Sequence, residues 1–306
     1  MSATLSVCVI QFTSDAHLVR CLDALTVQSA VTEVLVPHDD TLGSLAALRD
    51  RFPRCRFVSL HGRQTPAALR TAATHAAGGE IIAFLEDHCV PAPDWADQLL
   101  EVHRAPHAAV GGAVDKGFPP GRDDDSALNW AVYFTDYSRY MNPQPGGPSH
   151  SLTDCNVSYK RADLEAVRDS WNLEFHENIV NEALAARGAT LWLAPEVVVL
   201  EQRTLTLGGA LRDRYAFGRL FASTRVSGAP LRSRLTFTAG SMIMPPILVA
   251  RVVRNLFARR RHRAQLLRAL PALLLVTSTW MLGEFVGYVT GAPAARLRPV
   301  AALDPS

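Results

Sequence analysis

The chain has 306 residues, of which 48% are hydrophobic and 20% charged, and this composition excludes a disordered protein. The net charge of +2 conceals an asymmetry: residues 1–200 carry 15 Lys and Arg against 25 Asp and Glu, whereas residues 201–306 carry 16 Arg against four acids. An acidic body with a basic tail favours an anionic membrane surface over nucleic acid as partner, because long apolar runs separate the arginines.

The five cysteines, at positions 8, 21, 55, 89 and 155, are too far apart for a CxxC pair. This excludes zinc-ribbon and redox motifs of that kind, and the odd number indicates a reducing compartment. The N-terminus has no basic segment, so we expect no signal peptide. The sequence contains no GxGxxG, GxxxxGK or GxSxG motif, which argues against dinucleotide-binding, P-loop and hydrolase functions.

The first third of the chain alternates between predicted strands and helices. Short apolar runs predict strands at residues 5–12, 33–36, 55–60, 81–85 and 108–114. Helical spacing of apolar residues predicts helices at 17–28, 42–51, 66–77 and 94–103, the third of them with Thr65 as N-cap. This alternation with short connections predicts an α/β fold, in which a parallel sheet carries helices on both faces.

Beyond residue 115 the alternation is less regular. We expect helices at 127–140, 177–187 and 207–223, and strands near 157–159, at 190–193 and at 197–200. Three consecutive acids, Asp123, Asp124 and Asp125, precede the first of these helices. They could bind a metal, but we expect them to cap the positive end of that helix.

Two apolar segments near the C-terminus, residues 235–253 and 269–290, are each long enough to span a bilayer. The arginine-rich stretch 254–263 separates them, so a spanning first segment would place it outside, against the positive-inside rule. We therefore expect the first segment, broken at its prolines, to be interfacial or re-entrant, and the second to span or lie in the interface. The alternative is two buried helices of a soluble protein. The predicted domains are 1–230 and 231–306.

Acidic clusters follow two of the predicted strands. His38, Asp39 and Asp40 follow the second strand, and Glu86-Asp87-His88 follows the fourth. Ligands of parallel sheets bind outside the carboxyl ends of the strands. The first cluster could accept hydrogen bonds from a ribose or a base, and the second could hold a divalent cation that neutralises a diphosphate. The alternative is that both clusters are ordinary turn residues and helix caps.

Taken in order, these motifs resemble those of the family 2 glycosyltransferases of GT-A fold. Residues 5–12 and 34–40 resemble the first two strands of the family, and residues 79–88 resemble the approach to its DxD motif. Residues 154–164 are similar to its Gly-x-Asn-x-x-x-x-Arg acceptor-side segment, and residues 175–188 to its Glu-Asp helix. The resemblance covers about residues 4–225 and implies a GT-A-type sheet and an inverting transfer from a nucleotide-diphosphate sugar to a hydroxyl.

The resemblance also implies roles for the donor-side residues. Asp87 and His88 would hold a divalent metal, Mn²⁺ or Mg²⁺, with Glu86 on the ribose or a metal-bound water. Asp39 would contact the nucleotide, and Arg70 would lie near the diphosphate. His88 is a departure from the family, because imidazole replaces the last carboxylate of the DxD motif and suits softer metals than Mg²⁺.

On the acceptor side, the resemblance makes Glu177 the catalytic base and places Asn156 and Tyr159 near the acceptor. The alternative for Glu177 is a surface carboxylate in the first turn of a helix, where negative charge is favourable. A further departure is Glu201-Gln202, which stands where many members have a histidine. The Gln-x-x-Arg-Trp motif of processive members is also absent, so transfer of one or a few sugars is expected.

The basic, apolar tail suggests a lipid-linked or membrane-proximal glycan as acceptor. The expected location is the cytoplasmic face of a bacterial inner membrane, with no nucleic-acid partner. One alternative is a non-catalytic sugar-nucleotide-binding or membrane scaffold with a degenerate DxD site. A nucleotidyltransferase is a weaker alternative, because no glycine-rich loop with a lysine or arginine follows the first strand.

Overall fold

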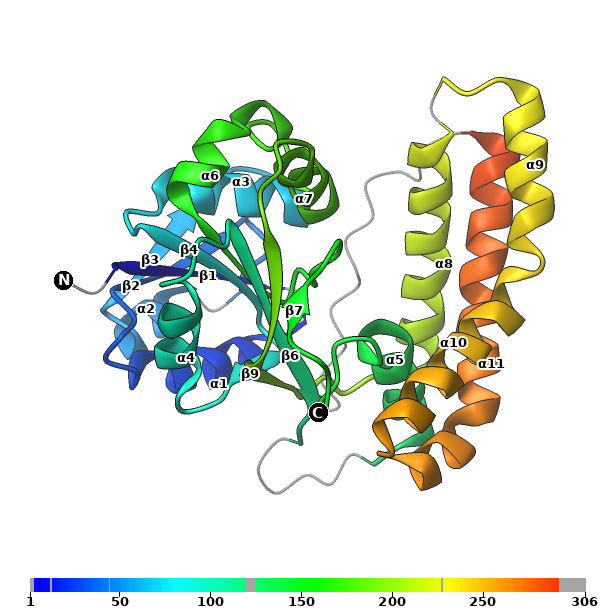
Figure 1. The fold of residues 1–306 in the computed structure, drawn as a ribbon, viewed down its shortest axis with the longest axis horizontal. Coiled ribbons are helices and arrows are strands. Elements are labelled where there is room, and N and C mark those ends of the chain that lie inside the picture. Colours follow the sequence, from blue (N-terminus) through cyan, green and yellow to red (C-terminus); the bar gives the residue numbers. More distant parts are fainter. Residues whose placement is uncertain (1–2, 12, 44, 119–124, 227, 292–306) are drawn as a thin grey trace. The chain divides into compact units, whose positions relative to one another are not determined.

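The computed structural model describes residues 3–11, 13–43, 45–118, 125–226 and 228–291. The chain forms two compact units. The sheet unit comprises Met1–Phe118 and Tyr140–Arg203, and the helical unit comprises Pro119–Arg139 and Thr204–Ser306. This division differs from the predicted boundary after residue 230, because two helices that precede that boundary group with the C-terminal helices (Figure 1).

Within the described residues, the sheet unit contains nine strands in the order β3-β2-β1-β4-β8-β6-β9-β5, with β7 paired to β9. Their bounds are β1 (Leu5–Ile10), β2 (Glu33–His38), β3 (Cys55–Ser59), β4 (Ile81–Glu86), β5 (Cys89–Pro91), β6 (Ala109–Lys116), β7 (Gly147–Pro148), β8 (Asn156–Lys160) and β9 (Leu191–Glu201). The strands from β3 to β4 are mutually parallel, as are β6 and β9, whereas β8 runs antiparallel to both neighbours. The predicted, mostly parallel α/β sheet is confirmed.

Helices cover both faces of this sheet (Figure 1). They are α1 (Asp15–Thr26), α2 (Leu45–Arg51), α3 (Pro66–Ala76), α4 (Trp95–Val102), α6 (Arg161–Ala166), the 3-10 turn η1 (Arg168–Ser170) and α7 (Glu177–Ala186). The predicted cap of α3 is confirmed, because the Thr65 hydroxyl accepts a hydrogen bond of 3.1 Å from the Ala68 N–H. Buried side chains of α3, α6 and α7 share one core cluster with Phe84 and Tyr159 of the sheet.

Strand β9 and the short strands β5 and β7 differ from the prediction. The structure has one eleven-residue strand, β9, where two strands were expected on either side of Pro195. The register of β9 against β6 shifts between Gly112 and Ala113, and this irregularity accommodates Pro195 within a continuous strand. The three-residue strand β5 was not predicted, because so short a segment carries no periodicity to detect.

The helical unit contains α5 (Ala127–Tyr137), α8 (Leu207–Arg225), α9 (Leu231–Ser241), α10 (Met244–Arg259) and α11 (Arg263–Thr290). The residue that caps α5 is Ser126, whose hydroxyl accepts from the Asn129 N–H at 3.2 Å, so the expectation of a capping acid is wrong for Asp125. Asp125 instead accepts hydrogen bonds from the side chains of Trp130 and Arg268. Asp123 and Asp124 lie outside the described residues.

By length and composition, α11 is the one helix of the described residues that could cross a membrane alone, with a mean hydropathy of 1.5. Helices α9 and α10 pass the same test only together, and they are bent by 53° at a break just before Pro245 and Pro246. The predicted interruption of the first apolar segment at its prolines is therefore confirmed.

Candidate active site

A buried arginine organises the carboxyl end of β4. Arg70, on α3, is 5% exposed, and its Nη2 atom lies 3.1 Å from Glu86 Oε1 and 3.0 Å from Asp154 Oδ2. Glu86 ends β4, and Asp154 lies just ahead of β8. One guanidinium thus ties three separate segments together and balances two carboxylates, whose charges would be costly in this position without it.

Glu177 belongs to the same electrostatic cluster. It is the first residue of α7 and is partly buried. Burial and the nearby charge of Asp154 raise the pKa of Glu177 to about 7, although Arg70 opposes that rise. A carboxyl group with this pKa is partly deprotonated at neutral pH and can accept a proton from a reacting hydroxyl. These surroundings differ from those of an exposed carboxylate in a first helical turn.

Tyr159 lies beneath this cluster and does not open to an acceptor. Its side chain is fully buried, and its hydroxyl donates to Asn181 Oδ1 at 3.0 Å. The ring packs against Phe84 and Phe175, with centroid separations of 6.2 Å and 5.7 Å. Burial, and then the charge of Glu177, raises the pKa of the Tyr159 hydroxyl well above its usual range. The structure therefore places Tyr159 in the core, in contrast to the acceptor-side prediction.

Asn156 is also committed to internal hydrogen bonds. Its amide nitrogen donates to the carbonyl oxygens of Ala113 and Val197, both at 2.9 Å, and its Oδ1 accepts from Trp95 Nε1 at 3.0 Å. Both N–H donors are used, and the residue is 1% exposed. Asn156 thus fastens β6 to β9 at their register shift, which does not match the predicted role in acceptor binding.

The side chains of Glu86, Asp87 and His88 do not point toward one common position at which a metal ion could bind. Asp87 is fully buried, and its Oδ2 accepts from the Thr13 backbone N–H at 2.8 Å and from the Thr13 hydroxyl at 3.0 Å. The two nitrogens of the His88 ring face different carboxylates: Nδ1 lies 3.3 Å from Asp87 Oδ1, and Nε2 lies 3.4 Å from Glu86 Oε2.

Within the described residues, no group of three or more His, Cys, Asp or Glu side chains could hold a metal ion. Carboxylate and imidazole groups suit Mn²⁺ as ligands. However, the His88 ring lies between the carboxylates of Glu86 and Asp87, and Thr13 already donates a hydrogen bond to Asp87. The residues as arranged therefore do not fit the predicted metal site. Burial and the charge of Asp154 also raise the pKa of Glu86 well above its usual range, which disfavours the ionised ligand.

Asp39 organises the loops at the carboxyl ends of β2 and β3. Its Oδ1 accepts from the Thr41 N–H at 2.9 Å and from the Thr41 hydroxyl at 2.6 Å, and its Oδ2 accepts from the Gln64 N–H at 2.6 Å. The side chain is buried, and these bonds connect the end of β2 with the segment that leads into α3. The role of Asp39 toward a nucleotide stays a prediction.

Two charged residues that the sequence reading did not assign stand out. Asp154 occupies the position of the glycine in the Gly-x-Asn motif, and this departure is the signal that could have identified it. Glu201 forms a salt bridge of 2.7 Å with Lys116, and both side chains are 2% exposed. Burial disfavours the ionised Glu201, but Lys116, Arg203 and His88 outweigh it and lower its pKa. Glu201 is thus the counter-ion of Lys116.

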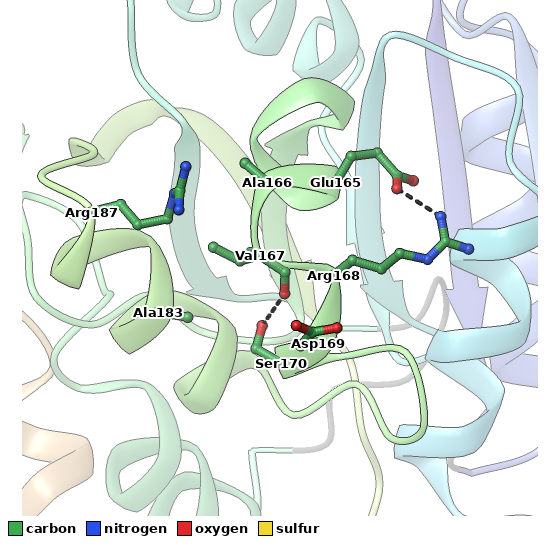
Figure 2. A pocket seen from close by; sticks show the side chains of 8 residues that line it. All are labelled: Glu165, Ala166, Val167, Arg168, Asp169, Ser170, Ala183 and Arg187. Atoms are coloured by element: carbon green, nitrogen blue, oxygen red, sulfur yellow. Dashed lines mark hydrogen bonds and ion pairs between the residues drawn. The ribbon is translucent and has the colours of Figure 1, made fainter.

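A surface hollow of about 410 Å³ lies near the C-terminal end of α7 (Figure 2). It is lined by residues of α6, η1 and α7 and by two residues that adjoin these elements, Val167 and Arg187; the full set is Glu165, Ala166, Val167, Arg168, Asp169, Ser170, Ala183 and Arg187. Arg168 pairs with Glu165 at 2.8 Å, and the Ser170 hydroxyl donates to the Val167 carbonyl at 2.7 Å. None of the predicted site residues lines this hollow, so it is separate from the candidate active site.

The family model described as glycosyl transferase family 2 matches residues 6–168. The chain belongs to glycosyltransferase family 2. The match runs from the second residue of β1 to the first residue of η1 and includes Arg70, Glu86 and Asp154, whereas Glu177 lies beyond it. A search among curated proteins found no match by sequence.

Two solved structures show the same fold at low sequence identity. The mannosyltransferase PcManGT from Pyrobaculum calidifontis, in complex with GDP-Man and Mn²⁺, has a TM-score of 0.51 at 17% identity and covers 95% of this chain and 87% of its own. S. aureus TarS 1-349, in complex with UDP-GlcNAc, has a TM-score of 0.50 at 12% identity and covers 92% and 90%. These similarities confirm the GT-A-type fold expected for this family 2 glycosyltransferase.

Proposed function

We propose that this family 2 glycosyltransferase moves a sugar from a nucleotide-diphosphate sugar to a hydroxyl acceptor with inversion. The observation that carries the proposal is the partly buried Glu177 carboxyl, with a pKa of about 7, near buried Arg70 and the two carboxyls that Arg70 contacts, Glu86 and Asp154. Family membership and the nucleotide sugars bound to the two solved relatives support the donor class.

The proposed reaction is a single displacement. The acceptor oxygen attacks the anomeric carbon, the bond between that carbon and the diphosphate oxygen breaks, and the acceptor proton passes to Glu177. The nucleoside diphosphate leaves with the bonding electron pair. We assign Asp39, Arg70 and Glu86 to the donor side, where Arg70 also holds Asp154 near the base.

A divalent metal ion is a separate prediction for this protein. As arranged in the structure, the side chains of Glu86, Asp87 and His88 do not fit such an ion. PcManGT holds Mn²⁺ with GDP-Man, and we propose Mn²⁺ or Mg²⁺ as the ion to test here. Transfer measured with EDTA and after re-addition of each ion tests that prediction.

We further propose that the acceptor is a lipid-linked or membrane-proximal glycan at the cytoplasmic face of a bacterial inner membrane. The arginine-rich helical unit and the apolar helix α11 support a membrane partner. We propose transfer of one or a few sugars, because the motif of processive members is absent.

The test is a screen of UDP-, GDP- and dTDP-sugars for consumption in the presence of candidate acceptors. The second candidate function, a non-catalytic sugar-nucleotide-binding scaffold, is favoured by the burial of Asp87 and His88. Nucleotide binding without sugar consumption would support the scaffold. Consumption that is lost in Glu177→Gln and kept in Glu182→Gln, on the exposed side of the same helix, would support the transferase.

A further inference from the structure

Exposed apolar side chains are concentrated in the helical unit. Of the 18 large apolar residues that are exposed in the described chain, only Val27, Leu173 and Ile179 belong to the sheet unit. Six of the others lie on α11, with 36% to 70% of each residue exposed: Leu267, Leu274, Leu275, Leu282, Phe285 and Val289. Exposure on this scale within one unit marks an interaction surface.

These six residues, called here the α11 stripe, occupy one face of the helix. Their spacing of seven, eight, fifteen, eighteen and twenty-two residues from Leu267 follows the helical repeat. The opposite face of α11 is buried against its own unit, through residues such as Leu273, Val276 and Gly287. The stripe extends over about 33 Å, from the rise of 1.5 Å per residue.

A second helix lies alongside the apolar part of α11 (Figure 1). Gly218 of α8 faces the carbonyl of Trp280 so closely that no Cβ could be accommodated, and Gly283 of α11 faces the carbonyl of Tyr215 in the same way. Further along, Gly287 faces the carbonyl of Arg219. The two backbones are therefore in direct contact over two turns of α11.

This neighbour is incompatible with a membrane-spanning α11. Helix α8 carries Arg212, Arg214, Arg219 and Arg225, and the last two lie within or beside the contact with α11. If α11 crossed a bilayer, these arginines would enter the hydrocarbon region, where a charged side chain is strongly disfavoured. An α11 that lies along the membrane surface carries no such penalty, because α8 can stay on the aqueous side.

The charge of the unit indicates which surface the stripe meets. Residues 204–291 contain thirteen arginines and only two acids, Asp213 and Glu284. Arg263 and Arg268 flank one end of the stripe, and Arg234 donates to the Tyr288 carbonyl at the other end, at 3.0 Å. An apolar face bordered by arginines matches the acyl boundary and the headgroups of an anionic lipid layer.

We propose that the α11 stripe docks on an anionic lipid bilayer and that α11 lies in the plane of the interface, without crossing it. This inference rests on the membrane association proposed above and defines its geometry. It does not depend on sugar transfer, so all its tests use the full-length protein without donor or acceptor.

The first test is co-sedimentation with phosphatidylcholine vesicles that contain or lack phosphatidylglycerol. We expect binding to the anionic vesicles, weakened by high salt. Leu274→Glu and Leu282→Glu are each expected to lower partitioning about tenfold to a hundredfold, the loss for one large apolar side chain. Leu173→Glu, at an exposed leucine of the sheet unit, is the matched control and should bind like the wild type. Circular dichroism checks that every variant is folded.

The second test measures depth in the bilayer with spin labels on single cysteines introduced at 267, 274, 282 and 289. The five native cysteines are free and buried, so the introduced thiols are the accessible ones. In-plane docking predicts one shallow depth for all four labels. A deep position at 274 and 282, with 267 and 289 at opposite surfaces, would overturn the proposal.

Three other results would also overturn it. One is absence of vesicle binding by folded protein, and another is equal binding to uncharged vesicles. The third is that the Leu274→Glu and Leu282→Glu variants bind vesicles like the wild type but lose self-association or binding to nucleic acid. The stripe would then serve one of those partners and not the lipid. Failure of the sugar-transfer assay leaves both vesicle tests unaffected, so the two proposals fail separately.

Discussion

The sheet unit and the helical unit distribute charge in opposite ways. In the sheet unit, charged side chains such as Arg70, Glu86, Lys116 and Glu201 are nearly inaccessible and are balanced by partners at hydrogen-bonding distance. In the helical unit, most arginines are at the surface, next to exposed leucines. Buried ion pairs hold the side chains of a site in place, whereas exposed charges beside apolar side chains suit a surface that binds a lipid membrane.

The largest expected effect concerns Glu177, the proposed base in the sheet unit. Glu177→Gln should lower kcat of sugar transfer by about 10²–10⁴-fold, because an amide cannot accept the acceptor proton. Steady-state transfer assays measure this effect, with Glu182→Gln as control. A Glu177→Gln enzyme with wild-type kcat would remove Glu177 from the mechanism.

The same variant has a readout that is independent of activity. Because the pKa of Glu177 is raised to about 7 in the folded protein, the folded state binds its proton more tightly than the unfolded state does. Stability is therefore lost as the pH rises from the usual carboxyl range through about 7. Glu177→Gln should raise Tm relative to the wild type above pH 7, and the difference should shrink below pH 5.

Loss of a buried arginine should have a far greater effect on stability than loss of an exposed one. Arg70→Met is expected to lower the free energy of unfolding by about 3–5 kcal/mol, because it leaves the buried Glu86 carboxyl without its cation and also removes the partner of the partly exposed Asp154. Arg251→Met, on the exposed surface of α10, should change it by less than about 0.5 kcal/mol. Denaturant titration of both variants tests this contrast, and equal effects would contradict it.

The backbones of α8 and α11 lie so close together that side chains larger than glycine do not fit at their contact. Gly283→Ala places a methyl group against the Tyr215 carbonyl and should cost about 1–3 kcal/mol. Gly240→Ala in α9 meets no atom within 4 Å and should stabilise the unit by about 0.5–1 kcal/mol, since alanine favours helix. Thermal unfolding followed by circular dichroism distinguishes them. Equal tolerance of both substitutions would mean that α8 and α11 are not in contact.

The smallest effect is a shift of the pH profile. Asp154 raises the pKa of Glu177, so Asp154→Asn should move the acid limb of kcat/KM to lower pH. Asp154→Glu keeps the charge and should leave the limb close to that of the wild type. Measurement of kcat/KM between pH 5 and 9 tests this, and an unmoved limb in Asp154→Asn would show that another group controls ionisation.

The sequence predicted the alternation of strands and helices because apolar periodicity is a local property. It could not predict that β8 lies between β4 and β6, since strand pairing depends on contacts between distant segments. The same limit applies to side chains. Arg70 and Asp154 are 84 positions apart, and nothing local shows that they meet.

The local sequence pattern also did not predict whether a side chain faces the acceptor or the protein core. Asn156 and Tyr159 match an acceptor-side motif, yet the structure commits their polar atoms to internal hydrogen bonds. Glu177 was predicted from its motif, but its pKa depends on Asp154 and Arg70, which the sequence does not place near α7. The candidate site is therefore predictable as a set of residue types and only partly as an arrangement.

The insertion of α5 has a consequence for synthesis of the protein on the ribosome. This helix is encoded between two parts of the sheet unit but packs with α10 and α11 of the helical unit. Its aromatic residues Trp130, Tyr133 and Phe134 are buried in the complete fold, in which α11 is the main partner of α5. At about 5–20 residues per second, α5 leaves the ribosome on the order of ten seconds before α11 is finished. A nascent chain that stalls before α11 thus exposes an aromatic helix, which makes it a substrate for chaperones.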